Sequence, residues 1–182
     1  SAKDLCSLPF LDQLVASGVA SFKIEGRARK PEYVYTVVRA YRAALDAIQA
    51  GTFTPALAAR LVEETKAVFH REYGTGLFYG RPGADQYTDQ EDSLATTVKR
   101  HAGIVLDYFL KAGIAQVQIQ DHPLAVGDTV QIHGPTTGVV EVTVASLRRD
   151  DEVLASAARG TWATFPCPRV RVGDKVFFME TR

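Results

Sequence analysis

Three charged side chains lie close together near the start of this 182-residue chain. Residues 21–25 read SFKIE, and an extended backbone places Lys23 and Glu25 on one face of that stretch. Arg27 follows two positions later. An ammonium, a carboxylate and a guanidinium at the carboxyl end of a barrel strand could hold an anionic substrate. An edge strand with a solvated polar face explains the same residues, and both interpretations stay open.

The two cysteines, Cys6 and Cys167, are too few for a disulfide framework. From the residues alone, each is either a buried small hydrophobic residue or a site of chemistry, and both interpretations stay open. The four histidines fall in unrelated contexts, which does not favour a metal site: His70, His101, His122 and His133. The motifs GxSxG, HExxH, GxxxxGK[ST], GxGxxG and CxxC are absent from the sequence.

Helical periodicity dominates the first half of the chain. A short helix is expected over residues 8–15, a strand over residues 20–25, a long helix from Pro31 to a stop at Gly51, and another helix with Thr54 as its N-cap. Apolar residues in the long helix follow a 3.6-residue period: Val34, Val37, Val38, Tyr41, Leu45 and Ile48. One strand among three helices has no ladder partner, so we expect this half to be the last part of a larger α/β barrel.

The second half alternates polar and apolar residues with period two, which predicts one-face-buried β-strands. Short spacings between turn signals are typical of a small antiparallel barrel or sandwich. The tripeptide VGD occurs at residues 126–128 and 172–174, each time before a predicted strand, and could form similar corners. The predicted organisation is residues 1–80 from an α/β domain, a Pro-, Gly- and Asp-containing linker over 81–98, and a β-domain over 99–182.

The composition is that of an ordinary globular protein, with 46% hydrophobic and 23% charged residues. The formal net charge is zero, so no field of the whole molecule attracts nucleic acid or a membrane. We expect a cytoplasmic protein with no membrane partner, because no apolar run is long enough to span a bilayer and no signal peptide is evident. Met179 is the only methionine, so we expect Ser1 not to be the start of translation.

Three stretches resemble peptidase family U32. They are KDLC at residues 3–6, GVASFKIEGRARKPEYVYTVVRAYRAALDA at residues 18–47, and YGTGLFYGRPGADQY at residues 73–87. The KIEGR stretch with its following helix is the most specific part, and residues 148–168 match only loosely. The resemblance covers nearly the whole chain.

The resemblance implies an α+β chain of two parts. The first is the C-terminal part of an α/β (TIM-like) barrel whose earlier strands lie upstream, and the second is a small antiparallel β-barrel similar to the second domain of translation elongation factors. Better understood members of the family are oxygen-independent hydroxylases that carry an iron–sulfur cluster on four cysteines. The last of these cysteines lies in a motif similar to KDLC, so Cys6 is implied to be the fourth ligand of a [4Fe-4S] cluster. The other three ligands would have to come from outside this chain.

The resemblance therefore favours an RNA hydroxylase that acts on tRNA wobble uridine or on ribosomal RNA cytidine, with a quinone precursor as another substrate known in the family. Lys23, Glu25 and Arg27 are the candidate catalytic residues, and a small-molecule hydroxyl donor is implied. Basic residues that could contact RNA phosphates are Arg29, Lys30, Arg148, Arg149, Arg169 and Arg171. A collagenase-like peptidase, as the family name states, is the alternative. The isolated chain is expected to be an inactive binding module, and the sequence does not indicate an oligomeric state.

Overall fold

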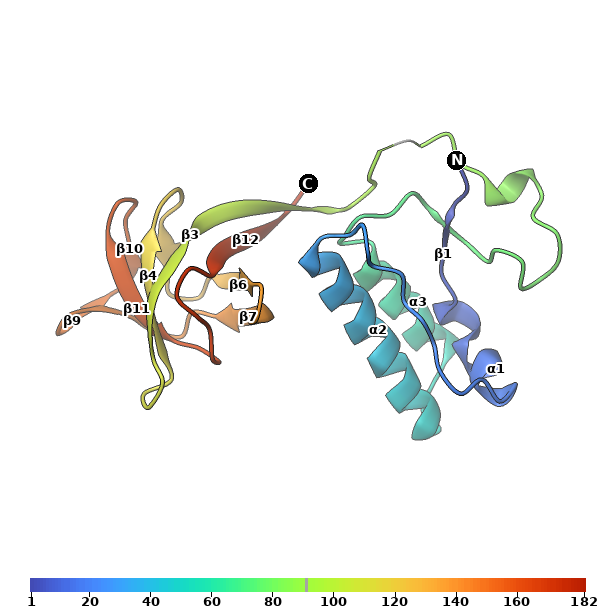
Figure 1. The fold of residues 1–182 in the computed structure, drawn as a ribbon, viewed down its shortest axis with the longest axis horizontal. Helices are drawn as coiled ribbons and strands as arrows, with labels where there is room; N and C mark the ends of the chain where they lie inside the picture. The colour runs from blue at the N-terminus through green and yellow to red at the C-terminus, as the bar shows by residue number, and fades with distance from the viewer. Residues whose placement is uncertain (91) are drawn as a thin grey trace. The chain divides into compact units, whose positions relative to one another are not determined.

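The computed structural model describes residues 1–90 and 92–182, and it divides into two compact units, Ser1–Thr96 and Thr97–Arg182 (Figure 1). The N-terminal unit contains the helices and two short strands, whereas the C-terminal unit is built from strands. The chain is therefore α+β. The end of the N-terminal unit is hydrogen-bonded to its beginning and middle, since Thr88 N–H donates to the Ser1 carbonyl at 2.8 Å and Thr96 N–H donates to the Lys66 carbonyl at 3.0 Å.

The helices of the N-terminal unit form where the sequence predicts them. Its elements are β1 (Asp4–Leu5), η1 (Leu8–Phe10), α1 (Leu11–Ala16), α2 (Pro31–Gln49), α3 (Pro55–Thr65), β2 (Tyr73–Gly74) and η2 (Ala84–Gln86). Gly51 ends α2 with a φ of 69°, and the Thr54 hydroxyl caps α3 by accepting the Leu57 N–H at 3.1 Å. No helix in the described part of the chain is long and apolar enough to cross a membrane.

Small residues bring the helices of the N-terminal unit together. Leu8 and Leu11 pack against Ala40 and Ala44 of α2 and against Leu61 of α3, and all five side chains are buried. Alanine at positions 40 and 44 allows this close approach, which a larger residue would prevent. The predicted apolar face of α2 is only partly correct, because Val34 and Val38 are exposed.

The expected strand over residues 20–25 does not form in the described structure. Its side chains keep the predicted alternation, with Phe22 and Ile24 half-buried and Lys23 and Glu25 exposed, but no neighbouring strand accepts its ladder hydrogen bonds. The expected order of helix, strand, helix, helix is therefore wrong. The strands that do form are β1 and β2, which pair in parallel and which the sequence pattern does not predict.

The C-terminal unit is dominated by one antiparallel sheet. Its strands are β3 (Thr97–Phe109), β4 (Ile114–Ile119), β5 (Leu124–Ala125), β6 (Thr129–Gly134), β7 (Gly138–Thr143), β8 (Leu147–Arg149), β9 (Glu152–Leu154), β10 (Ser156–Ala157), β11 (Trp162–Pro166) and β12 (Lys175–Thr181). Among the described residues, eight of them form a sheet in the order β7-β6-β12-β3-β4-β11-β8-β9, and β5 pairs with β10. Alternate residues of these strands, such as Val117, Ile119 and Ile132, are fully buried and form a separate core. Closure of this sheet into a barrel stays a prediction.

The two VGD tripeptides form matching corners, in agreement with the sequence analysis. Asp128 accepts the Ala125 N–H and Asp174 accepts the Arg171 N–H, both on Oδ2 at 2.8 Å. The central glycines have φ values of 94° and 87°, a conformation that favours glycine. In both corners the glycine N–H also donates to a valine carbonyl at 2.9 Å. The two corners therefore direct the chain into β6 and β12 by the same set of contacts.

Gly134 is required by the second corner. A Cβ at this position would overlap Oδ1 of Asp174, and that carboxylate is fixed because its Oδ2 accepts the Arg171 N–H and the Thr137 hydroxyl. We expect Gly134→Ala to lower the free energy of unfolding by about 1–3 kcal/mol, the usual cost of overpacking. Denaturant unfolding measures this, with Thr136→Ala in the same exposed turn as the control. Equal stability of Gly134→Ala and the wild type would contradict the prediction.

Candidate functional site

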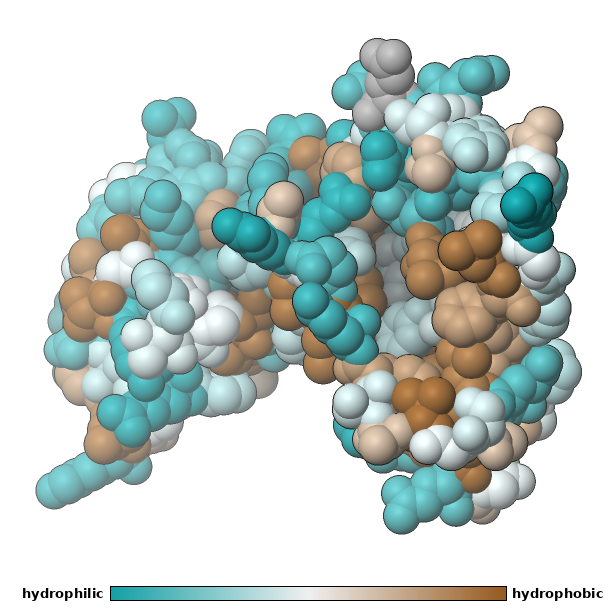
Figure 2. All heavy atoms as spheres, turned by 45° about the vertical axis from the view of Figure 1, so that its right-hand side comes forward, coloured by the Kyte–Doolittle hydropathy of each residue, from teal (hydrophilic) through white to brown (hydrophobic). Residues whose placement is uncertain are grey.

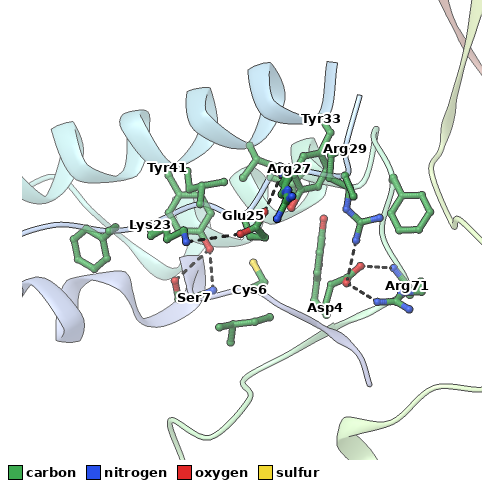
Figure 3. Close-up of a pocket in the computed structure, with 18 of the residues that line it drawn as sticks. Asp4, Cys6, Ser7, Lys23, Glu25, Arg27, Arg29, Tyr33, Tyr41 and Arg71 are labelled. Atoms are coloured by element: carbon green, nitrogen blue, oxygen red, sulfur yellow. Dashed lines mark hydrogen bonds and ion pairs between the residues drawn. The ribbon is translucent and has the colours of Figure 1, made fainter. Parts of the chain in front are cut away.

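A pocket of about 800 Å³ lies within the N-terminal unit (Figure 3). Residues of β1 and the turn after it, of the extended segment 21–29, of α2, and of the stretch 65–78 line the pocket. The structure thus brings Cys6, Lys23, Glu25, Arg27 and Arg29 to one place, although they come from separate parts of the sequence.

Cys6 lies in the wall of this pocket, directly after β1. Its backbone N–H donates to the Gly74 carbonyl at 3.0 Å, which continues the pairing of β1 with β2. The next residue is anchored to α2, because Ser7 N–H donates to the Tyr41 hydroxyl at 3.0 Å. Burial raises the pKa of the Cys6 thiol, and hydrogen bonds from the Leu8 backbone and from Tyr41 only partly oppose that effect. In this state the thiol is neutral near pH 7.

Lys23, Glu25 and Arg27 lie at the mouth of the pocket, exposed to solvent. Lys23 Nζ is 3.9 Å from Glu25 Oε2, and the two side chains are 88% and 71% exposed. An ion pair with this exposure contributes at most about 1 kcal/mol. The other Glu25 oxygen, Oε1, accepts the Arg27 N–H at 2.9 Å and holds the turn that follows. Lys23 and Glu25 therefore lie on the same face of the segment, as the alternating sequence predicts, although the segment does not form a strand.

Gly26 lets this segment lie against α2. A Cβ at position 26 would be 2.8 Å from Cγ2 of Val34, closer than side chains pack in proteins. Lys30 is not part of the pocket lining, because it precedes α2 as its N-cap residue and is exposed.

Sequence analysis missed an ion cluster at the inner end of the pocket. Asp4 Oδ1 is 3.2 Å from Arg71 Nη2 and 3.5 Å from Arg29 Nη2, while Asp4 Oδ2 accepts the Arg71 N–H at 3.0 Å. All three residues line the pocket (Figure 3). Arg71 and Asp4 are 67 positions apart, and a single sequence gives no signal that β1 and β2 bring them together.

Tyrosine hydroxyls complete the polar groups of the pocket. Burial raises the pKa of Tyr33, while the Arg29 guanidinium next to it has a smaller opposite effect. Burial also raises the pKa of Tyr73 far above its ordinary value and raises that of Tyr41. These hydroxyls stay protonated near neutral pH, where each can donate one hydrogen bond.

Cys6 is suited to hold only part of an iron–sulfur cluster. Thiolates are the usual ligands of such clusters, so the donor type fits. In the part of the chain that the structure describes, however, no group of three or more His, Cys, Asp or Glu side chains could hold a metal ion. Cys167 belongs to the C-terminal unit, so within the pocket Cys6 can supply a single sulfur ligand.

The four candidate RNA-binding arginines of the C-terminal unit fall in two places in its structure. Arg148 and Arg149 are on β8, and Arg169 and Arg171 lie in the turn before β12. Two of them already have partners within the unit, since Arg149 is 3.7 Å from Glu152 and Arg171 Nη1 donates to the Thr137 hydroxyl at 3.1 Å. Arg148 and Arg169 are exposed.

Residues 1–88 match the profile of peptidase family U32. A protein named Collagenase from Porphyromonas gingivalis is 36% identical over 100% of this chain, and the match covers 44% of that protein. The tRNA hydroxylation protein P1 of Bacillus subtilis is 30% identical over 87% of this chain, and the match covers 37% of it. This chain therefore spans less than half the length of these two relatives.

Solved structures match part of the chain. One of them is the C-terminal domain of a Geobacillus thermoleovorans protein described as a U32 peptidase, with 25% identity and a TM-score of 0.40. The match covers 43% of this chain and 98% of that domain.

Both thiols are expected to resist modification in the folded chain. Burial raises the pKa of Cys167 from 9.0 to about 11 and also raises that of Cys6, so few thiolates form at pH 8. We expect iodoacetamide to modify both cysteines in denaturant and to leave both unmodified without it, as read by mass spectrometry. Modification of either thiol at the same rate in both conditions would contradict this.

The raised Cys167 pKa also predicts a pH dependence of stability. The folded state keeps this thiol protonated up to about pH 11, whereas the unfolded state loses the proton near pH 9. The thiol therefore contributes full stability below pH 9, and that contribution is lost as the pH rises toward 11. When the pH is raised from 8 to 11, the free energy of unfolding should fall less in Cys167→Ala than in the wild type.

Proposed function

Because residues 1–88 place this chain in peptidase family U32, we propose that it is the C-terminal part of an enzyme that hydroxylates a base in RNA without molecular oxygen. Uridine at the wobble position of tRNA is the first candidate substrate, and ribosomal RNA cytidine is the second. The observation that carries the proposal is the position of Cys6, a single soft ligand in the wall of a pocket with cations at its mouth. The similarity to tRNA hydroxylation protein P1 over most of the chain supports the same function.

The proposal includes a TIM-like barrel that the N-terminal unit completes. β1 and β2 pair in parallel, as barrel strands do, and the segment 21–25 is an alternating stretch without a ladder partner. Large hydrophobic side chains are exposed on this unit: Leu5, Val34, Val38, Leu77, Phe78 and Tyr79. Figure 2 shows hydrophobic side chains gathered on the face of this unit that is in view. Barrel strands and helices from a longer protein would pair with this segment and cover these side chains.

Cys6 would supply one thiolate of a [4Fe-4S] cluster, whose other three ligands come from that longer protein. The cluster, when bound, supplies electron transfer. The chain's own contribution is to fix the sulfur, since the Gly74 and Tyr41 contacts hold the backbone on both sides of it. Because burial disfavours the thiolate in the absence of a metal, cluster binding would have to displace the thiol proton.

Lys23, Glu25 and Arg27 would bind the substrate at the pocket mouth. Lys23 and Arg27 offer positive charge to an anionic group, and their exposure makes them accessible to a macromolecule. Glu25 is the carboxylate among them and could accept a proton from the base. A small-molecule hydroxyl donor would enter the same pocket.

The C-terminal unit would hold the RNA. We propose that its sheet closes into a barrel similar to the second domain of elongation factors, and that the exposed arginines contact phosphates. The surface arginines available for this are Arg148 and Arg169, with Arg149 and Arg171 released from their internal partners on binding. Lys30, which is exposed before α2, would contact phosphate from the N-terminal unit, whereas the predicted RNA contact Arg29 lies in the pocket.

A collagenase-like peptidase is the second candidate function. The match to the protein named Collagenase favours it, because its 36% identity extends over the whole chain. Peptide hydrolysis requires an activated nucleophile or a metal-bound water. The Ser7 hydroxyl in the pocket wall is hydrogen-bonded to the Tyr41 hydroxyl at 3.2 Å. No histidine lines the described pocket, so this serine has no histidine there to activate it. A peptidase would need catalytic groups from outside this chain, which in isolation would then be an inactive binding module.

Nucleoside mass spectrometry tests the proposal without assuming a substrate. Deleting the gene that encodes this chain should abolish one hydroxylated nucleoside in tRNA or ribosomal RNA, and the wild-type gene should restore it. A gene carrying Glu25→Gln should not restore it, whereas one carrying Glu63→Gln on the exposed face of α3 should. An unchanged nucleoside profile after deletion would exclude RNA hydroxylation and favour a peptide or small-molecule substrate.

Iron content tests the assignment of Cys6. We expect Cys6→Ser in the longer protein, purified without oxygen, to lose iron and the broad visible absorbance of a cluster. Cys167→Ser is the matched control, because that thiol belongs to the other unit and should not affect iron. Unchanged iron in Cys6→Ser would remove this residue from the cluster site.

A further inference from the structure

The ion cluster at the inner end of the pocket carries more positive charge than its carboxylate can balance. Asp4 is the acidic group between Arg29 and Arg71, with its Oδ1 3.5 Å and 3.2 Å from their respective Nη2 atoms. The side chains are recessed, with 25% of Arg29, 31% of Arg71 and 23% of Asp4 exposed. Each recessed charge costs desolvation energy, so an arrangement with one excess cation is unfavourable unless an anion joins it.

The guanidinium of Arg29 is fixed before any ligand binds. Its central carbon lies 3.9 Å from the ring centroid of Phe69 and 5.4 Å from that of Tyr33, and Asp4 contacts one of its nitrogens. A guanidinium carries five N–H donors in a rigid fork, so the remaining donors are oriented for a further acceptor. Little side-chain entropy is then lost when an oxyanion binds, which favours affinity.

Arg71 is held by Asp4 in two ways. Its backbone N–H donates to Oδ2 at 3.0 Å and its Nη2 donates to Oδ1 at 3.2 Å. Its Nε is buried without a hydrogen-bond partner among the described residues. A buried unpaired donor lowers stability, so the position of this Nε is not explained by the contacts within the described chain.

The whole pocket also has an excess of positive charge. Four cationic side chains line it against two carboxylates, Asp4 and Glu25: Lys23, Arg27, Arg29 and Arg71. Lys23 and Glu25 pair with each other at the mouth, which leaves Arg27 and the inner cluster. The volume of about 800 Å³ is within the roughly 300–1,000 Å³ of small-molecule sites.

From this geometry we propose that Arg29 and Arg71, positioned by Asp4, form a subsite for the carboxylate or phosphate group of a small molecule that binds inside the pocket. The inference rests on the proposed function only in taking this pocket as the place where reactants bind. The recessed position of both arginines distinguishes this subsite from the exposed cations that usually contact an RNA backbone. The planar fork of a guanidinium matches a carboxylate or phosphate with two parallel hydrogen bonds.

Titration calorimetry on the purified chain tests the subsite, with inorganic phosphate and benzoate as separate probes at low ionic strength. We expect saturable one-site binding of at least one probe, and the tighter of the two identifies the anion as phosphate or carboxylate. Arg29→Gln and Arg71→Gln should each weaken that binding tenfold or more. Arg60→Gln is the matched control, because Arg60 pairs with Glu64 on the exposed face of α3. This variant should bind the probe with an affinity within twofold of that of the wild type.

Arg29→Gln decides the outcome if Arg71→Gln fails to fold, since Arg71 still pairs with Asp4 in that variant. Absence of saturable binding of both probes to the wild-type chain, or equal affinity in Arg29→Gln, would overturn the proposal. An RNA hairpin serves as a third probe, and binding of the hairpin alone that depends on Arg29 would assign the arginines to the RNA backbone instead. The titration needs no iron–sulfur cluster and measures no modified nucleoside. A negative titration would therefore not contradict RNA hydroxylation. In the same way, an unchanged nucleoside profile would not contradict anion binding.

Discussion

Parallel pairing of β1 with β2 is the constraint on which the candidate site depends. It joins the start of the N-terminal unit to a stretch almost 70 positions later, with Asp4 opposite Tyr73 in the ladder. The Cys6 N–H extends this pairing to the Gly74 carbonyl, and the Asp4 carboxylate accepts the backbone N–H of Arg71, two residues before β2. Loss of this two-residue ladder would separate Cys6 from Gly74 and Asp4 from Arg71 together. A contact of such small size therefore positions the sulfur, the carboxylate and one arginine simultaneously.

The pocket separates charged groups from neutral ones by depth. Its exposed mouth carries Lys23, Glu25 and Arg27, where water screens charge, and its wall carries a thiol that burial keeps protonated. The inner guanidiniums are the exception, because they are recessed and charged, and aromatic faces and one carboxylate compensate their charge only in part. A reactant with an anionic end and a neutral body would match this gradient, since each part would meet groups of complementary polarity.

The sequence predicts the local structure of this chain well and its long-range pairing poorly. Glycine stops, the Thr54 cap and the VGD corners act within a few residues, so their patterns identify α2, α3 and the two turns. β1 and β2 have two residues each, too short for any periodicity, and their pairing spans the whole N-terminal unit. The segment 20–25 has the alternation of a strand but no neighbour to pair with, so pattern alone overestimates its structure. For the site, alternation correctly groups Lys23 with Glu25, whereas Asp4 and Arg71 become visible as partners only in three dimensions.

The strand order of the C-terminal unit has a consequence for biosynthesis. β12 lies between β3 and β6, so the strand made last in this unit joins two parts of the sheet that are made earlier. About 70 residues separate the end of β3 from the end of β12, and at roughly 5–20 residues per second the ribosome needs on the order of several seconds to make them. Until β12 is made, β3 and β6 each keep at least one unpaired edge, and unpaired edges are sites of aggregation. The sheet of this unit can therefore be completed only after its final strand has been made.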